Sequence, residues 1–392
     1  MMKRIPLIDD AFLRLESRNQ PLHIGVLMML DPGPKAADDY AAKLVARLRR
    51  SEGAAELFNQ RLADKRGAHY WEDSPDFDLD HHFVHLALPR PGRIRELFDM
   101  VSRLHSSHLD RAFPLWRVYL IEGIEDGRIA LYMKVHHAMV DGVGGMEMLL
   151  GSMSTSRAES RKMPPLWETK RRRKQKKVTP VVPAPALADR IRVRSVTMDS
   201  WRAAMPVISK LRKTFQDFDA HNPDVALAGE APKCVFNEPI SGTRRFSAQS
   251  YSRPRIKRVA AAINATSNDI VLAMVAGALR RYLEARGELP DKPLTAGVPI
   301  SIRNRSGGSD AGNQVAFAIS NLATHIDDPI ERMRAIKRSM DYNKGQLQGL
   351  SSGQIQAYSS LSTVPGAVNV LLGRKPGNTL GNAVVSNIPG PA

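Results

Sequence analysis

The sequence predicts an α/β protein of two domains, and three observations support this. The chain has 392 residues, which is longer than a domain with a single hydrophobic core usually is. Hydrophobic residues make up 43% and charged residues 25%, which leaves enough apolar mass for two cores. Strand-like and helix-like segments alternate in both halves of the chain, as is typical of α/β architecture.

The first half, residues 1–160, combines apolar runs with helical periodicity. Apolar residues recur every three or four positions in residues 38–50 and 94–109, which predicts amphipathic helices. A third helix is expected from Gly142, because Asp141 before it is a residue type that caps helices well. The expected strands are residues 24–30, 117–121 and 129–135.

The second half, residues 198–392, repeats this alternation. Helices are expected over residues 198–218, 268–283 and 330–347, and strands over residues 295–302, 315–322 and 383–386. Thr266 or Ser267 would cap the second of these helices. The first helix is amphipathic, and either packing against the protein body or lying in a lipid interface would explain its apolar face.

A strongly basic segment separates the two halves. Residues 161–177 contain nine basic residues and one acid, a net +8 out of the chain's +17. The proline-containing residues 179–185 that follow cannot hold a regular helix. We therefore expect a linker over residues 161–197, either a solvated tether or a polybasic patch for an anionic membrane or lipid droplet surface. Nucleic acid is not expected as a partner, because aromatic residues are not interleaved with the charges.

Cysteine usage and hydropathy indicate the compartment. Cys234 is the only cysteine, which excludes an intrachain disulfide and fits a reducing cytosol. No apolar signal core follows Met1. The longest apolar stretch, residues 270–279, is about half of the roughly twenty residues that a membrane span needs. The sequence predicts a cytoplasmic protein that meets membranes only peripherally, on the inner face or on lipid inclusions.

A histidine pair after an expected strand is the clearest chemical signal. His136 and His137 follow that strand, and Asp141 and Gly142 come after a short turn. Histidine can take a proton from a hydroxyl at neutral pH and return it, which suits a general base. Only one of two neighbouring strand residues can face a given cleft. Asp141 can bond the backbone or pair with an arginine to set the loop, and Gly142 leaves room for a ligand or another backbone.

The pattern HHxxxDG at these four positions resembles the signature of bacterial wax ester synthase/diacylglycerol acyltransferases, a family of the wider chloramphenicol acetyltransferase-like group. Five further segments are similar to other motifs of that family and follow its order. They are Pro21-Leu22-His23-Ile24-Gly25, Pro114-Leu115-Trp116, Asn268-Asp269, Val298-Pro299-Ile300-Ser301-Ile302-Arg303 and Ser386-Asn387-Ile388-Pro389-Gly390-Pro391. Together these segments span nearly the whole chain.

The resemblance implies two chloramphenicol acetyltransferase-like domains, each with a mixed sheet, joined by the basic linker. It implies an O-acyltransferase that moves a fatty acyl group from acyl-CoA to a long-chain alcohol or diacylglycerol, without a cofactor. His137 would be the general base, and the acceptor hydroxyl would attack the thioester directly. His136 would shape the pocket, and Asp141 would be structural, with Arg303 as its expected partner.

The same resemblance implies further substrate contacts in both halves. Asn268 would orient a substrate group, and Pro114 and Trp116 would wall the acyl channel, while Trp116 also fits a core position. Family members usually continue beyond the last motif, so the second domain is expected to lack its last strands.

Other interpretations stay open at this point. A condensation-type enzyme with an amine or carrier-bound acceptor would keep the fold, and a non-enzymatic lipid-surface protein would need only the basic linker. His81, His82 and His85 lie among Phe77-Asp78-Leu79-Asp80 and Phe83-Val84, which favour a surface strand. Their spacing suits three metal ligands on neither a helix nor a strand, so we expect no metal site there. Cys234 has no histidine nearby in the sequence and is expected to be a bystander thiol.

Overall fold

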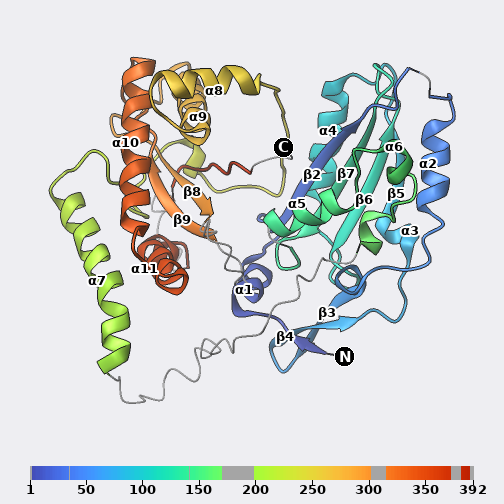
Figure 1. The fold of residues 1–392 in the computed structure, drawn as a ribbon, viewed down its shortest axis with the longest axis horizontal. Helices are drawn as coiled ribbons and strands as arrows, with labels where there is room; N and C mark the ends of the chain where they lie inside the picture. The colour runs from blue at the N-terminus through green and yellow to red at the C-terminus, as the bar shows by residue number, and fades with distance from the viewer. Residues whose placement is uncertain are drawn as a thin grey trace. The chain divides into compact units, whose positions relative to one another are not determined.

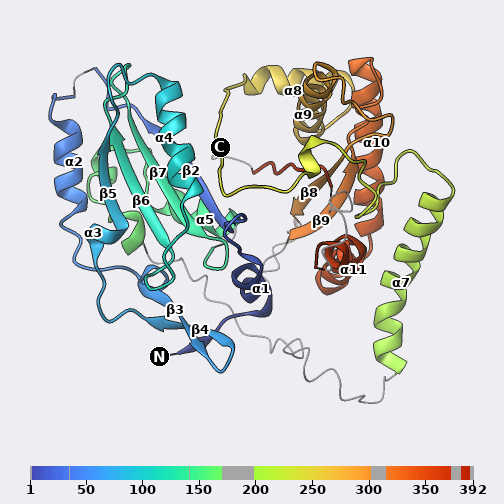
Figure 2. The ribbon, with the colours of Figure 1, turned by 180° about the vertical axis from the view of Figure 1, so that it is seen from behind.

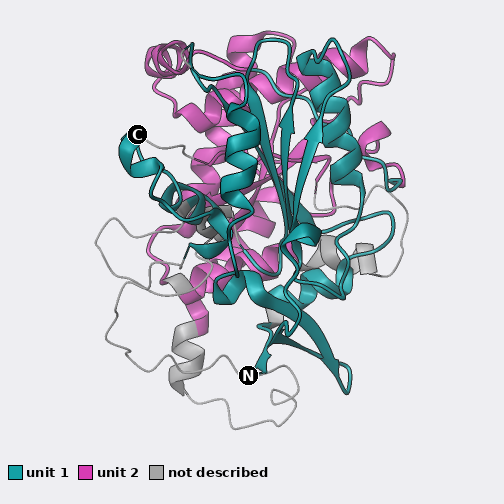
Figure 3. Cartoon of the chain, turned by 90° about the vertical axis from the view of Figure 1, so that its right-hand side faces the viewer, with its two compact units in different colours: residues 1–174, 240–249, 390–392 teal, residues 175–239, 250–389 magenta. Residues whose placement is uncertain are grey.

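The chain forms two compact units, drawn in different colours in Figure 3. This computed structural model describes residues 2–34, 36–140, 142–169, 198–301, 315–371 and 381–388. Unit 1 consists of residues 1–174, 240–249 and 390–392, and unit 2 of residues 175–239 and 250–389. Each unit has helices and a sheet with both parallel and antiparallel neighbours, so the expected mixed α/β architecture is confirmed.

The centre of unit 1 is a four-stranded sheet in the order β2-β7-β6-β5 (Figure 1). Its strands are β2 (His23–Leu30), β7 (Ile129–His136), β6 (Trp116–Glu122) and β5 (Phe83–Ala87). β2, β7 and β6 are antiparallel neighbours, and β5 runs parallel to β6.

Alternate residues of this sheet enter two different cores. Val118 and Met133 share one core with α2 (Tyr40–Leu48) and α5 (Gly142–Gly151). Tyr119 and Tyr132 share the other core with α4 (Ile94–Ser106), which lies across its face of the sheet in Figure 2. Because both faces are covered, the strands read as continuous apolar runs in the sequence.

Unit 1 also contains elements that the sequence patterns did not predict. A small antiparallel sheet has the order β1-β4-β3, with strands β1 (Lys3–Arg4), β4 (Ala68–Asp73) and β3 (Gln60–Lys65). The further helices described in this unit are α1 (Leu7–Leu15), α3 (Leu79–His82) and α6 (Arg157–Ser160).

Residues 240–249 lie in the second half of the sequence but pack on α4 of unit 1. The backbone N–H groups of Arg244 and Phe246 donate to Ser106 Oγ and Ser102 Oγ, each at 2.8 Å. The Phe246 ring also meets Phe98 edge to face, with centroids 5.1 Å apart. The second half of the chain therefore contributes a segment to the first unit.

Unit 2 is built on a three-stranded sheet in the order β10-β8-β9. β8 (Thr295–Ser301) is antiparallel to β9 (Val315–Asn321) and parallel to β10 (Ala383–Val384). The helices are α7 (Met198–Asp219), α8 (Arg253–Ala262), α9 (Ser267–Glu284), α10 (Pro329–Leu347) and α11 (Ser352–Leu371). α9 and α10 share a core with the sheet, and α7 packs on α11.

Among the described residues, no single helix is both long and apolar enough to cross a bilayer. α8 and α9 reach that length and composition only as a pair, and the two helices are bent by 98° relative to each other.

Candidate functional site

The histidine pair stands where β7 ends, and two carbonyl groups hold its backbone. The N–H of His136 donates to Leu115 O at 2.9 Å, and the N–H of His137 donates to Leu22 O at 2.9 Å. Leu115 is the central residue of the P-L-W segment and Leu22 that of the P-L-H segment. Three of the sequence motifs therefore meet at this point of unit 1, and two of them fix the backbone of the third.

The side chains of the two histidines lie in different surroundings. His136 is 1% exposed, and its Nδ1 accepts a hydrogen bond from Ala138 N–H at 3.1 Å. His137 is half-buried, and its ring is stacked on Phe12 of α1, with centroids 4.4 Å apart and ring planes 11° apart. His137 is thus the more accessible of the two rings.

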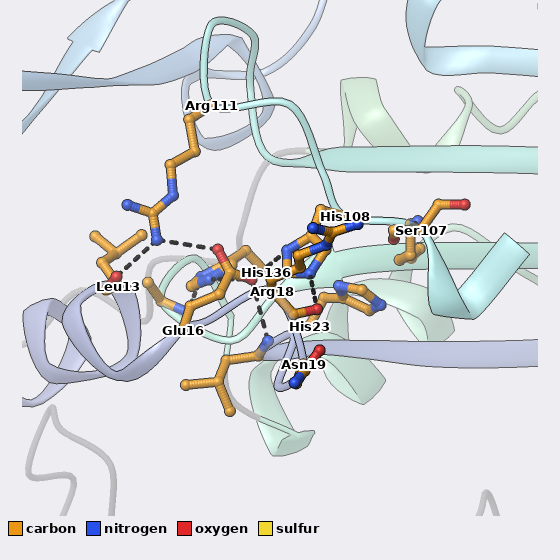
Figure 4. Close-up of polar contacts among 12 residues, drawn as sticks. Leu13, Glu16, Arg18, Asn19, His23, Ser107, His108, Arg111 and His136 are labelled. Carbon is orange, nitrogen blue, oxygen red and sulfur yellow. Dashed lines mark hydrogen bonds and ion pairs between the residues drawn. The ribbon is translucent and has the colours of Figure 1, made fainter. Parts of the chain in front are cut away.

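A carboxylate that the sequence patterns did not indicate lies beside His136. Glu16 caps the C-terminus of α1, its side chain is 6% exposed, and Figure 4 shows its neighbours converging on it. Its partners are His136 Nε2 at 3.5 Å, His108 Nδ1 at 3.7 Å, Arg111 Nη2 at 3.0 Å and Leu22 N–H at 3.1 Å. Its position shortly before the P-L-H segment is the one sequence signal that could have drawn attention to it.

These neighbours keep Glu16 ionised. Burial raises the pKa of Glu16, but the nearby His136 ring and hydrogen bonds from the Leu22 N–H and Arg111 outweigh burial and lower the pKa to about 2. At neutral pH the cluster therefore holds a fixed negative charge next to the histidine pair.

The P-L-H-x-G segment forms a second polar cluster on the α4 side of the sheet. His23 Nε2 donates to His105 O at 2.7 Å, and the Tyr132 hydroxyl lies 2.7 Å from His105 Nδ1. Burial lowers the pKa of His23 to about 3, so this ring is neutral at physiological pH. A Cβ at Gly25 would lie 2.7 Å from the Tyr132 hydroxyl oxygen, which explains why a glycine stands there.

Replacing Gly25 with alanine is expected to lower the free energy of unfolding by about 1–3 kcal/mol, because the new methyl group must push Tyr132 away from His105. Thermal and urea unfolding measure the change. Gly53→Ala is the matched control, because no atom of another residue lies within 4 Å of a Cβ built there. Equal stability of both variants would contradict the role given to Gly25.

A buried lysine of β7 binds the backbone carbonyls at the C-terminus of α4. Lys134 is 1% exposed, and its ammonium donates to Leu104 O at 2.8 Å and Ser107 O at 2.7 Å. Leu104 lies in the last turn of α4 and Ser107 is its C-cap, so Lys134 binds carbonyls at a helix end, where backbone acceptors lack helical partners. Burial lowers the pKa of Lys134 to about 8, so the group remains largely charged at neutral pH.

The P-L-W segment lies in the aromatic core of unit 1. Trp116 has no exposed surface, its Nε1 donates to Phe58 O at 2.7 Å, and its ring is stacked on His82 and Trp167. Pro114 is also buried. Of the two positions that the sequence allowed for Trp116, the structure places the ring in the core.

The candidate residues in the second half can be placed only in part. Asn268 is half-buried in the first turn of α9. The neighbouring Asp269 is fully buried and forms a capping box with Thr266, so the expected cap is confirmed. Asp141 and Arg303 lie outside the described residues, whereas Gly142 is the first residue of α5.

The expected surface strand around the other histidines is confirmed only in part, because β5 (Phe83–Ala87) contains His85 but not His81 and His82. His81 and His82 belong to helix α3, and His82 is fully buried, with Nδ1 2.8 Å from Trp116 O. Its stacking on Trp116 explains the burial, which the sequence pattern did not reveal. His85 lies on β5, 3.1 Å from Glu122. In the described part of the chain, no group of three histidine, cysteine or acidic residues is arranged to hold a metal ion.

Comparisons with known proteins agree with the motifs. Residues 6–271 match the family model of the wax ester synthase/diacylglycerol acyltransferase catalytic domain, and residues 311–392 match that of its C-terminal domain. The chain is 41% identical over 394 aligned residues to O-acyltransferase WSD of Acinetobacter baylyi, covering 100% of this chain and 83% of that protein.

Solved structures give the same result. The wax ester synthase/diacylglycerol acyltransferase of Marinobacter aquaeolei superposes with a TM-score of 0.76 at 35% identity, over 100% of this chain and 83% of that one. The first condensation domain of the calcium-dependent antibiotic synthetase shares only the fold, with a TM-score of 0.53 at 16% identity over 98% of this chain and 80% of that domain. The chain belongs to the wax ester synthase/diacylglycerol acyltransferase family.

Proposed function

We propose that the protein transfers a fatty acyl group from acyl-CoA to the hydroxyl of a long-chain alcohol or of diacylglycerol, with His137 as the general base. The observation that carries this assignment is the contrast between the two histidines. His136 is enclosed and its Nδ1 is engaged by the backbone, whereas His137 is the more accessible ring and is held by Phe12.

The chemistry needs one proton carrier and no covalent enzyme intermediate. His137 takes the proton of the acceptor hydroxyl while the oxygen attacks the thioester carbonyl carbon. The new C–O bond forms, the C–S bond breaks, and the CoA thiolate leaves and recovers the proton from His137. Cys234 is not assigned a role, because its Sγ lies in unit 2 at 3.4 Å from Asn237 and Asn382, without a histidine among these contacts.

Other residues complete the proposed site. Gly142 would give the acceptor close access to the start of α5, and Asn268 would orient a substrate group from the first turn of α9. Pro114 would help to shape the acyl channel. The expected pairing of Asp141 with Arg303 stays a prediction, because both residues lie outside the described part of the chain.

Release of CoA tests this function directly. The purified protein is incubated with palmitoyl-CoA and either hexadecanol or diacylglycerol, and free thiol and lipid product are measured together. CoA release matched by wax ester or triacylglycerol supports the proposal. Release without ester product would indicate hydrolysis, and no release with either acceptor would contradict the proposal.

We also propose that the protein contacts an anionic membrane or lipid droplet surface from the cytoplasmic side. The basic segment 161–177 provides one element, and seven of its nine basic residues lie outside the described part of the chain. Helix α8 provides another, because it contains four basic residues and the sequence between Glu238 and Asp269 contains no acid. The exposed residues of α8 and of the two residues before it include Tyr251, Arg253, Arg255, Lys257, Arg258 and Val259.

Replacing the seven basic residues within 170–177 with glutamine is expected to weaken binding to anionic vesicles, since each contributes about 1 kcal/mol near such a surface. The same change at the four basic residues of α8 should weaken it further. Sedimentation with vesicles measures binding, and vesicles of neutral lipid are the control. The proposed surface contact would be contradicted if neither variant bound anionic vesicles less tightly than the wild type and if added salt did not weaken binding of the wild type.

A further inference from the structure

One carboxylate connects the N-terminal helix to the histidine pair. Oε1 of Glu16 is shared by the Leu22 N–H, His136 Nε2 and His108 Nδ1, while Oε2 faces Arg111. Arg111 also donates to Leu13 O at 2.6 Å, which ties the end of α1 to the same cluster. Nearly all of this carboxylate is shielded from water, so its charge acts on its neighbours with little screening.

The hydrogen bonds around His136 determine where its ring proton resides. Ala138 N–H can only donate, so Nδ1 of His136 must carry the lone pair that accepts it. The proton of the neutral ring is then on Nε2, the nitrogen that lies 3.5 Å from Glu16 Oε1. This separation exceeds that of a usual N–H···O hydrogen bond, about 2.7–3.2 Å, so the attraction between the N–H and the carboxylate is mainly electrostatic.

The bond to Ala138 has a consequence for the neighbouring histidine. Nδ1 of His136 and its carbonyl oxygen accept from Ala138 N–H at 3.1 Å and Met139 N–H at 3.0 Å. These two bonds shape the turn that begins at His137. If the His136 proton were on Nδ1, the Nδ1–H group would face the Ala138 N–H, and two donors cannot form a hydrogen bond with each other. The turn would then lose one of its two hydrogen bonds.

The same helix also contacts the second histidine. Phe12 and Glu16 are four residues apart, the spacing that places side chains on one face of a helix. The Phe12 ring is stacked on His137, and the Glu16 carboxylate is paired with His136. One face of α1 and its cap therefore contact both members of the pair.

We propose that Glu16 is a positioning residue for the reaction: its carboxylate holds the proton of His136 on Nε2, and His136 in turn holds the backbone turn that presents His137. This inference rests on the proposed role of His137 as the base. Glu16 itself contacts neither substrate nor the reacting atoms in this scheme.

Glu16→Gln, Glu16→Asp and Asp10→Asn are the test variants. Glutamine keeps the shape and the acceptor for Leu22 N–H but removes the charge, whereas aspartate keeps the charge. Asp10 is the matched control, because it lies on the same helix and its carboxylate also pairs with a histidine, His69, and with Arg14, away from the histidine pair. Thermal melting first establishes that each variant is folded.

With palmitoyl-CoA and hexadecanol as substrates, Glu16→Gln is expected to lower kcat by about 10- to 100-fold, the same magnitude as the loss of a hydrogen-bond partner that orients a metal-binding histidine. KM for palmitoyl-CoA should stay at the wild-type value. Glu16→Asp should recover most of kcat, and Asp10→Asn should keep all of it. The inference is overturned if Glu16→Gln has wild-type kcat, or if Glu16→Asp loses as much as Glu16→Gln.

A spectroscopic measurement separates this inference from the proposed function. In protein with ¹⁵N-labelled histidine, the His136 signals are assigned by their loss in His136→Ala. We expect a proton on Nε2 in the wild type and a mixed or reversed tautomer in Glu16→Gln. A wild-type His136 with its proton on Nδ1 would overturn the inference, even if Glu16→Gln did not fold. Absence of acyl transfer in the wild type would instead overturn the proposed function.

Discussion

Replacing His137 with alanine is expected to lower turnover by at least about 10² to 10⁴-fold, the usual contribution of a general base. The variant loses the only proton acceptor that the proposed mechanism places at the acceptor hydroxyl. Binding of acyl-CoA should remain nearly intact, because the thioester is not held by the base. Steady-state rates with hexadecanol and palmitoyl-CoA, combined with a direct measurement of acyl-CoA binding, separate the two effects.

His136→Ala is the matched comparison for this prediction. Its ring is enclosed and is bonded to Ala138, so its loss should reduce turnover less than the loss of His137 and should also reduce stability. Both variants are compared after thermal melting shows that they are folded. An indispensable His136 beside a dispensable His137 would reverse the assignment of the base. Wild-type turnover in both variants would contradict catalysis by the pair and leave a non-enzymatic lipid-surface role.

The long apolar elements were predictable from the sequence. The expected strand over residues 129–135 and the expected helix over residues 330–347 differ from β7 and α10 by one residue at one end. β7 reads as a continuous apolar run because its residues enter both cores of unit 1, and α10 buries Ile336 and Met340, which are four residues apart on one helix face. Helix α8 was not predicted, because it buries Ala260 and exposes most of its other residues, so it has no apolar stripe.

Short polar elements and distant contacts could not be predicted in the same way. β3 reads QRLADK, and its pairing with β4 stabilises a pattern that has no clear alternation. Residues 240–249 pack on α4 through backbone hydrogen bonds to two serines, which leave no trace in local periodicity. Both results depend on partners that lie elsewhere in the sequence.

The candidate site was also predicted only where its residues are close together in the sequence. The histidine pair and its two leucine carbonyls belong to motifs that were recognised, because each motif is contiguous in the sequence. Phe12 and Glu16 were missed, because their contacts with the pair join segments far apart in the chain. Motif recognition located the histidine pair, whereas its contacts with Phe12 and Glu16 follow only from the tertiary structure.

Replacing Trp116 with alanine is expected to lower the free energy of unfolding by about 3–5 kcal/mol, the usual cost of removing a buried aromatic side chain. The ring has no exposed surface, and its packing against Phe58, His82 and Trp167 would be replaced by a cavity. The carbonyl oxygen of Phe58 would also lose the indole N–H as a donor. Urea unfolding followed by circular dichroism measures the loss.

Trp116→Phe distinguishes a core residue from a wall of the acyl channel. Phenylalanine keeps most of the packing but leaves the buried Phe58 carbonyl without this donor, so stability should fall by about 1–3 kcal/mol, less than in Trp116→Ala. If Trp116 acts only in the core, this variant keeps the wild-type preference among acyl-CoA chain lengths. A changed chain-length preference without a large loss of stability would instead favour the channel role. The full burial of the ring leads us to expect the first result, because a side chain without exposed surface cannot contact the acyl chain directly.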